Sequence, residues 1–192
     1  HMADPFVSLA AAAAVTDHIK LGTGICLVNE HDVIALAKQV ATLDRISNGR
    51  FLFGVGAGWN VEEMANHGIA FEERWAQLRE RVEAMKALWT QEEASYHGKY
   101  VSFDRVWFYP KPISQPHPPI ILGTFASEIG RQRVADYGDG WIPVTSFFRD
   151  VSAAVRDMRI RAHAAGRAGD ITVSTFFIAP QPPEHKLAEA LE

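Results

Sequence analysis

The stretch that most constrains the fold covers residues 50–60, with the sequence RFLFGVGAGWN. Its apolar half, residues 51–55, is typical of a buried strand, and glycines follow at alternate positions: Gly54, Gly56 and Gly58. A helix-compatible segment comes next. A buried strand that opens into a glycine-rich loop before a helix commonly holds a phosphate, because the loop amides are uncovered and the helix N-terminus adds partial positive charge. This stretch therefore predicts one strand–loop–helix unit of an α/β protein.

The rest of the chain repeats this unit. Residues 31–46 and 71–89 carry apolar side chains at three- and four-residue steps, as on one face of an amphipathic helix. We expect further helices over 4–16, 127–137 and 151–165 and from about Glu184, and strands over 19–28, 51–55, 120–123, 138–144 and 171–179. Strands that alternate with helices predict a parallel sheet covered by its crossover helices.

Residues 93–118 interrupt this alternation. A turn is expected over 96–100, and the aromatic-rich residues 101–109 are typical of extended chain. We interpret 93–118 as a hairpin-like insertion in a single domain that covers residues 3–192. The first two residues, His1 and Met2, are interpreted as a cloning remnant and are left out of the fold.

The spacing of the glycines decides between two α/β architectures, the open doubly wound sheet and the (β/α)8 barrel. A dinucleotide-binding loop has the pattern G-x-G-x-x-G, and here Trp59 stands where the third glycine should fall. The Walker pattern with Gly-Lys-Ser/Thr is absent from the sequence. A barrel remains, and barrels hold phosphates at the C-terminal ends of their strands.

The composition excludes several classes of function. Of the 192 residues 47% are apolar and 22% are charged, and the net charge is −4, so nothing in the charge balance favours a nucleic acid or a membrane as partner. The single cysteine, Cys26, excludes a disulfide framework and fits a reducing compartment. The apolar run 9–15 is too short to span a bilayer. We expect a cytoplasmic protein that acts on a small-molecule substrate.

Six short motifs together resemble one known family. They are IKLGTGI at 19–25, AKQVATLDR at 37–45, GRFLFGVGAGW at 49–59, FEER at 71–74, FYPKP at 108–112 and YGDGW at 137–141. In this combination the chain resembles the bacterial luciferase-like monooxygenase superfamily, and most of all the branch that uses the deazaflavin coenzyme F420. The resemblance implies a (β/α)8 TIM barrel with an insertion. It also implies that this chain carries five parallel strands, which resemble strands three to seven of the eight, so that the barrel is partial.

The resemblance places a cofactor beside the first of these strands. At Gly24 and Ile25 the resembled enzymes carry a bulge with a non-prolyl cis peptide that supports the cofactor ring. The alternative is that the glycines of this strand only relieve crowding inside the barrel. Two loops at strand ends are then candidates for the cofactor's phosphate or polar linker. The first consists of Gly56, Ala57, Gly58, Trp59 and Asn60, and the second contains Gly123, Thr124 and Ser127. The alternative for the first loop is a tight turn that binds nothing.

Other chemistry-bearing residues have structural interpretations. Asp44, Arg45 and Arg50 are expected to form ion pairs around a helix end, Arg131 to be solvated, and Cys26 to be a small core residue. The histidines show no metal-ligand spacing, so no metal site is predicted. His31 and His67 follow strand ends. They are weak candidates for an active site, and the preferred interpretation of each is a loop residue. For Trp59, Trp107 and Trp141 core packing is preferred to a flavin pocket. No catalytic residue is assigned.

Three functional hypotheses follow. The resemblance implies an F420-dependent oxidoreductase that transfers a hydride between the deazaflavin and an organic substrate. A flavin mononucleotide (FMN) monooxygenase of the same fold is the alternative, because glycine loops serve either phosphate. The third hypothesis is a non-catalytic barrel fragment that acts as an oligomer or interaction module. A homo-oligomer is expected, since an open five-strand sheet leaves two edges that a barrel would pair.

Overall fold

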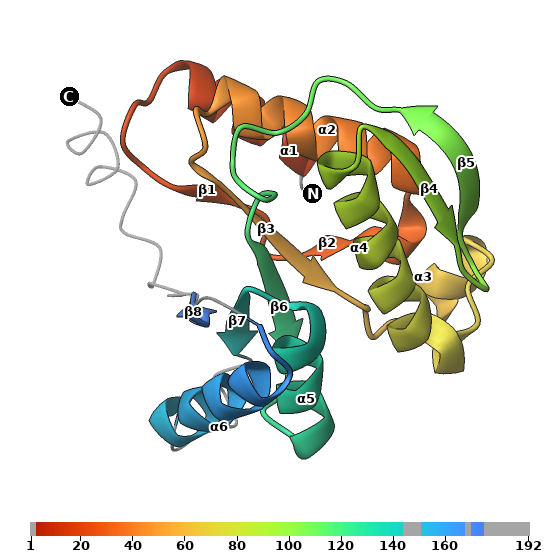
Figure 1. Cartoon of the computed structure of the whole chain (residues 1–192), viewed down its shortest axis with the longest axis vertical. Coiled ribbons are helices and arrows are strands. Elements are labelled where there is room, and N and C mark those ends of the chain that lie inside the picture. Colours follow the sequence, from red (N-terminus) through yellow and green to blue (C-terminus); the bar gives the residue numbers. More distant parts are fainter. Residues whose placement is uncertain (1–2, 144–150, 168–169, 175–192) are drawn as a thin grey trace.

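The computed structural model describes residues 3–143, 151–167 and 170–174, which form an α/β structure (Figure 1). Its helices are α1 (Pro5–Ala14), α2 (Val33–Ile46), α3 (Val61–Asn66), α4 (Arg74–Thr90), α5 (Glu128–Tyr137) and α6 (Val151–Ala164), with 3-10 turns η1 (Val28–Glu30) and η2 (Phe71–Glu73). Its strands are β1 (Leu21–Gly22), β2 (Cys26–Leu27), β3 (Phe51–Gly56), β4 (Glu93–His97), β5 (Ser102–Trp107), β6 (Ile120–Thr124), β7 (Gly140–Pro143) and β8 (Thr172–Val173). The order of elements is the predicted one. The helix predicted from Glu184 and the end of the strand predicted over 171–179 lie outside the described residues.

Helices begin where short polar side chains satisfy the free N–H groups of the first turn. Asp4 Oδ1 accepts a hydrogen bond from Val7 N at 2.9 Å, with Pro5 in the first turn of α1. Asp32 Oδ1 accepts one from Ala35 N at 2.8 Å at the start of α2. The predicted start of α2 at residue 31 was therefore two residues too early. None of the helices in the described ranges has the length and hydropathy needed to cross a bilayer.

The strands form a curled parallel sheet with the order β1-β3-β6-β7-β8, and β2 pairs with β3 beyond the end of β1. In register, Phe53 lies opposite Ile120 and Val55 opposite Leu122, while Ile121 lies opposite Gly140. Every pairing in this sheet is parallel, because helices lie between β2 and β3, between β3 and β6, between β6 and β7 and between β7 and β8 and return the chain to the same end of the sheet. The predicted fold class, a partial barrel of five parallel strands, is confirmed (Figure 1).

The two faces of the sheet differ, because successive side chains of a strand point to opposite sides. On β3, Phe51 and Phe53 face the helices, and the Phe6 ring of α1 packs 6.3 and 6.5 Å from their ring centroids. Phe53 also makes an edge-to-face contact with Trp89 of α4, at 6.3 Å. The main hydrophobic core therefore lies between the outer face of the sheet and the helices.

The predicted hairpin insertion is present as the antiparallel pair β4–β5. Its turn is fixed to α4, because the Glu80 carboxylate accepts hydrogen bonds from the backbone N–H groups of Lys99 and Val101, at 3.0 and 2.6 Å. Trp107, at the end of β5, is 74% exposed and donates its indole N–H to Glu93. Core packing at Trp107 was therefore a wrong expectation: the side chain lies on the outer side of a two-stranded ribbon that nothing covers within the described residues.

The expected ion pairs around the end of α2 were wrong for Asp44 and Arg50. Both side chains are buried, yet each bonds to the backbone and not to the other. Asp44 accepts hydrogen bonds from Ile113 N and Ser114 N at 2.8 and 2.9 Å. The Arg50 guanidinium donates to carbonyl groups at the end of α1 and before β1. Helix ends leave carbonyls unpaired, and a buried cation satisfies several of them at once. The Arg45 guanidinium donates a long hydrogen bond to Lys111 O, at 3.4 Å.

Candidate functional site

The first strand of the sheet is interrupted by a bulge. Gly22 lies opposite Leu52 and Cys26 lies opposite Val55, so four steps along this strand match three along β3. One residue is therefore extra, and it leaves the ladder between β1 and β2. The peptide bond between Gly24 and Ile25 is cis. The sequence-based expectation of a bulge with a cis peptide at this position is confirmed.

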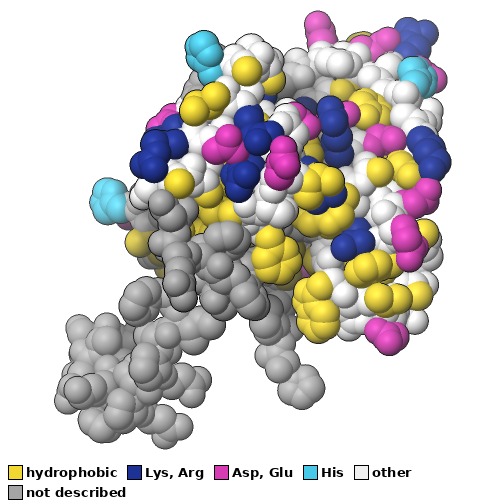
Figure 2. All heavy atoms as spheres, turned by 90° about the horizontal axis from the view of Figure 1, so that it is seen from below, with side chains coloured by type: hydrophobic (Ala, Val, Ile, Leu, Met, Phe, Trp, Pro, Cys, Tyr) yellow, Lys and Arg dark blue, Asp and Glu magenta, His cyan; other side chains and the backbone are white. Residues whose placement is uncertain are grey.

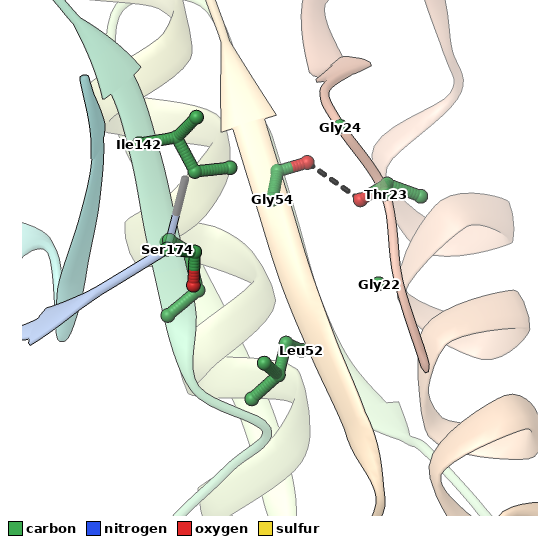
Figure 3. A pocket seen from close by; sticks show the side chains of 8 residues that line it. Gly22, Thr23, Gly24, Leu52, Gly54, Ile142 and Ser174 are labelled. Carbon is green, nitrogen blue, oxygen red and sulfur yellow. Dashed lines mark hydrogen bonds between the residues drawn. The ribbon is translucent and has the colours of Figure 1, made fainter. Parts of the chain in front are cut away.

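A glycine on β3 lets the bulge approach the neighbouring strand. A Cβ atom at Gly54 would lie 1.9 Å from the Thr23 carbonyl oxygen, which no real side chain permits. Instead, Thr23 Oγ1 donates a hydrogen bond of 2.7 Å to the Gly54 carbonyl oxygen, as Figure 3 shows. The bulge is thus held against β3 by a close backbone contact and by one buried hydroxyl.

The Ile25 side chain explains two further glycines. A Cβ at Gly56 would lie 2.4 Å from Ile25 Cδ1, and one at Gly123 would lie 2.9 Å from Ile25 Cγ2. Gly56 and Gly123 follow the paired residues Val55 and Leu122 on neighbouring strands, so the Ile25 side chain lies across both. These two glycines have a packing role, which the sequence analysis did not foresee. Cofactor binding by either one stays a prediction.

A cavity of about 130 Å³ adjoins the bulge on the inner face of the sheet (Figure 3). Backbone and small side chains form one wall, and apolar side chains form the other. Its lining residues are Gly22, Thr23, Gly24, Leu52, Gly54, Ile121, Ile142 and Ser174. Of the predicted site residues, Gly24 therefore lines this cavity, and Ile25 is the next residue along the chain.

The loop after β3 turns sharply at Gly58, which has a φ of +78°, and then exposes Trp59. Trp59 is 84% exposed, whereas Trp141 is fully buried on β7, so core packing was the wrong expectation for Trp59 and the right one for Trp141. Ala57, between the glycines, is buried. The loop thus places one aromatic side chain in solvent at the C-terminal end of β3.

The amide donors at the start of α3 are partly occupied. The Asn60 side-chain oxygen accepts hydrogen bonds from Glu62 N and Glu63 N, at 3.1 and 3.2 Å. Two carboxylates in the first turn also offset the partial positive charge of this six-residue helix. These contacts do not favour a phosphate, and binding by this loop stays a prediction.

In the loop after β6, too, hydrogen-bonding groups are occupied by partners within the protein. The buried Thr124 accepts the Trp141 indole N–H on its carbonyl oxygen at 2.9 Å, and Ser127 Oγ caps α5 by accepting from Gly130 N at 3.2 Å. Arg131 was expected to be solvated; it donates to Asp157 Oδ2 at 2.6 Å instead. In the view from below, acidic and basic side chains intermingle on this face (Figure 2), in keeping with such paired charges.

Two titratable side chains meet beyond β2. Glu30 Oε2 lies 3.9 Å from His67 Nε2. Burial, and then the nearby Glu63 carboxylate, raise the pKa of Glu30 above its usual range, and His67 opposes that shift. Burial lowers the pKa of His31. Sequence reasoning named the two histidines but missed Glu30, because only the fold brings α3 next to η1.

Cys26 is a buried thiol on β2. Burial first, and then the Glu30 and Asp4 charges, raise the pKa of Cys26 to about 12. This supports the interpretation of Cys26 as a core residue, since the thiolate is the reactive form. Among the residues that the structure describes, no group of three or more His, Cys, Asp or Glu side chains could hold a metal ion.

We predict that Cys26 resists a disulfide reagent such as Ellman's reagent at pH 8 in the native protein and reacts at once in denaturant. The raised pKa also makes the folded thiol hold its proton more tightly than the unfolded one, so its contribution to stability is present below pH 9 and is lost toward pH 12. A Cys26→Ala variant should show a weaker fall in stability over that range in urea titrations. Rapid labelling of the native thiol at pH 8 would contradict this prediction.

The curled parallel sheet, with helices outside and a bulge beside an inner cavity, places the chain in the class of α/β-barrel proteins. The sequence profile of the luciferase-like monooxygenases matches residues 1–192, and the chain belongs to this family. It is 45% identical over 179 residues to an uncharacterized protein of Mycobacterium tuberculosis, a match that covers 93% of this chain and 63% of that protein. It is 31% identical to the FMNH(2)-dependent dimethylsulfone monooxygenase of Pseudomonas putida, with 95% of this chain and 50% of that enzyme covered.

Solved structures show the same fold. The monooxygenase RslO1 from Streptomyces bottropensis superposes with a TM-score of 0.80 at 30% identity, covering 98% of this chain and 59% of that one. The coenzyme F420-dependent tetrahydromethanopterin reductase from Methanopyrus kandleri superposes with a TM-score of 0.76 at 25% identity, covering 91% and 54%. Relatives thus include enzymes that use F420 and enzymes that use FMN, and the chain spans between half and two thirds of their length.

Proposed function

We propose that this chain carries the cofactor-supporting part of an F420-dependent oxidoreductase, which transfers a hydride between the deazaflavin and an organic substrate. The observation that carries this proposal is the bulge at Gly24 and Ile25, which adjoins a cavity on the inner face of the sheet. A solved relative that uses F420 supports it.

The residues at the bulge fit a flat ring better than they fit a phosphate. Gly24 is exposed and presents bare backbone, while Ile25 is fixed by its contacts across Gly56 and Gly123. The cavity of about 130 Å³ is too small to enclose a three-ring deazaflavin, so the ring belongs at its mouth, on the backbone of the bulge. When bound, the deazaflavin supplies the hydride chemistry. The chain's own part is to hold the ring flat and to keep water from its inner side.

An FMN-dependent monooxygenase is the second candidate. It is favoured by the match to the dimethylsulfone monooxygenase and by the superposition on RslO1. Both candidates need the same flat ring at the bulge. A fluorescence titration of the purified chain with F420 and, separately, with FMN in its oxidised and reduced forms tests them. Preference for one cofactor selects its candidate, and no binding of either at tens of micromolar would argue against both.

We predict that Gly24→Val weakens binding of the preferred cofactor at least about tenfold, a difference of about 1.4 kcal/mol, because the new side chain stands where the ring lies. Gly24 is exposed, so the fold should be retained. Ala14→Val, on the exposed side of α1, also creates a branched valine side chain but away from the bulge, and serves as the control. Equal affinities of the two variants, measured by the same titration, would place the cofactor elsewhere.

A further inference from the structure

The short helix α3 is held to the rest of the protein by few buried contacts. It covers Val61–Asn66, and Met64 is its only buried residue. Met64 packs closely against Gly58, where an added Cβ would lie 2.4 Å from Met64 Cε, and the next buried side chain along the chain is Ile69. A helix of this length does not form by itself in water, and a segment with few buried contacts opens locally at a low cost in free energy. One further contact therefore has a large effect on how much of the time α3 is docked.

Glu30 and His67 supply such a contact at the C-terminal end of the helix. His67 is the C-cap residue of α3, and its Nε2 lies 3.9 Å from Glu30 Oε2 on η1. The Glu30 side chain is 12% exposed, and its other oxygen, Oε1, is buried and accepts no hydrogen bond from any described residue. A buried carboxylate without donors is costly when it is charged. A protonated His67 ring opposite it lowers that cost.

The other titratable groups near Glu30 do not supply a positive charge. Burial, and then the Glu63 carboxylate on α3, raise the pKa of Glu30, and only His67 opposes them. On β2, the buried Cys26 thiol keeps its proton, because burial and then the Glu30 charge raise its pKa to about 12. The charge of Glu30 is therefore balanced by His67 or not at all among these groups.

His67 also faces a second histidine. Burial lowers the pKa of His31, and the charges of Asp4 on α1, His67 and Arg81 on α4 act on it in turn. The Arg81 guanidinium is engaged with η1, since its Nη1 donates to His31 O at 2.7 Å. His31 is thus neutral over more of the pH range than an ordinary histidine, so the charge that faces Glu30 depends on His67.

We propose that Glu30 and His67 form a pH-sensitive latch, which holds α3 on η1 while His67 is protonated and releases α3 when His67 loses its proton. Glu30 binds its proton more tightly when α3 is docked, because burial raises its pKa. The docked form alone places a charged His67 opposite a charged Glu30. Both effects favour docking at low pH, and docking is lost as the pH rises through the range of 5 to 8 in which histidines change charge.

The latch acts on the loop that precedes α3. Residues 57–60 join β3 to this helix (Figure 1), and the Asn60 side chain accepts hydrogen bonds from Glu62 N and Glu63 N in its first turn. Release of α3 therefore frees the loop that carries Trp59 at the C-terminal end of β3. This inference goes beyond the proposed function, because it holds whichever cofactor the protein uses and whether or not the loop binds it.

Native-state hydrogen exchange of the full chain, without cofactor and corrected for the intrinsic pH dependence of exchange, tests the latch. The amides of His67 and Ile69 donate to Met64 O, so they report whether the end of α3 is closed. We expect their protection to fall at least about tenfold from pH 5.5 to pH 8.5, while the protection of α4 stays constant. Glu30→Gln keeps the shape of the side chain without its charge and should remove this fall. Glu62→Gln removes an exposed carboxylate from the same helix and should keep it.

Protection at these amides that does not change with pH would overturn the latch, as would an undiminished fall in Glu30→Gln. An equal loss of protection in α4 would also overturn it, because the whole fold and not α3 would then be opening. His67→Asn is the second variant, since asparagine is accepted at helix ends. It should remove the fall, and a fall like that of the unmodified chain would assign the titration to another group. Cofactor binding is not measured, so this experiment can fail while the proposed function stands, and the reverse.

Discussion

Replacing Gly54 by alanine should destabilise the protein by at least about 3 kcal/mol, although only one methyl group is added. The new Cβ would lie 1.9 Å from the Thr23 carbonyl oxygen and 3.2 Å from Ile142 Cδ1. The first neighbour is backbone and cannot rotate away. The bulge must therefore leave β3, and the hydrogen bond from Thr23 Oγ1 to Gly54 O is lost with it.

Urea denaturation followed by circular dichroism measures this loss. Gly22→Ala is the matched control, since Gly22 lies on the same face two residues before the bulge and its Cβ would meet Leu52 O at 3.2 Å. That contact is relieved by a small shift, so the control should lose about 1 kcal/mol or less. If both variants were equally stable, the close approach of the bulge to β3 would not be a feature of the folded protein.

The same substitution should also abolish cofactor binding in whatever fraction stays folded, because the bulge is displaced. The Gly54→Ala variant is thus expected to lose both stability and cofactor binding, whereas Gly24→Val is expected to block the ring while leaving stability unchanged. The two variants separate a contact that the fold needs, between Gly54 of β3 and the bulge, from a position that the ligand needs, at Gly24 in the bulge.

The sequence predicted most of the fold, because the helices and strands follow local patterns. Apolar spacing and capping residues such as Asp32 are local signals, and they located the helices to within a few residues. The cis peptide between Gly24 and Ile25 was anticipated only through the family resemblance. The strand over 19–28 was itself predicted to be interrupted, and the structure divides it at a bulge. Two glycines within one strand, Gly22 and Gly24, were the local sign of it.

The candidate site was harder to predict from the sequence, because its geometry depends on contacts between residues that lie far apart along the chain. Gly54, Gly56 and Gly123 were interpreted as members of phosphate-facing loops, while in the structure their missing side chains make room for Thr23 and Ile25. That role depends on which strands are neighbours and in what register. Spacing along the chain carries no such information.

Charged residues in the core show the same limit. Asp44 bonds to Ser114, which lies 70 residues further along the chain, so an ion pair with a nearby arginine was the natural but wrong expectation. The sequence indicated that these residues were structural. It did not indicate that their partners are backbone groups of distant segments.

Arg50 should prove as important to stability as any apolar core residue. Its side chain is 9% exposed, and the guanidinium donates to Ser47 O at 2.7 Å, Thr16 O at 2.7 Å and Ala13 O at 3.1 Å. It also donates to Ile19 O at 2.9 Å, just before β1. The guanidinium thus links the end of α1, the end of α2 and the start of β1. The carbonyl groups at the two helix ends carry the partial negative charge of a helix C-terminus, which a cation stabilises.

We predict that Arg50→Met destabilises the protein by about 3–5 kcal/mol, because it fills a similar volume yet leaves several buried carbonyls without donors. Arg50→Lys should recover only part of the loss, since an ammonium group cannot reach acceptors on three sides as a planar guanidinium does. Arg159→Met is the control, as Arg159 is half-exposed and pairs with the exposed Asp170, so about 1 kcal/mol or less is expected. Urea titrations of the three variants test this order. A loss for Arg50→Met no larger than that of the control would show that these carbonyls find other donors, and the junction that positions β1 beside the cavity would then depend on apolar packing alone.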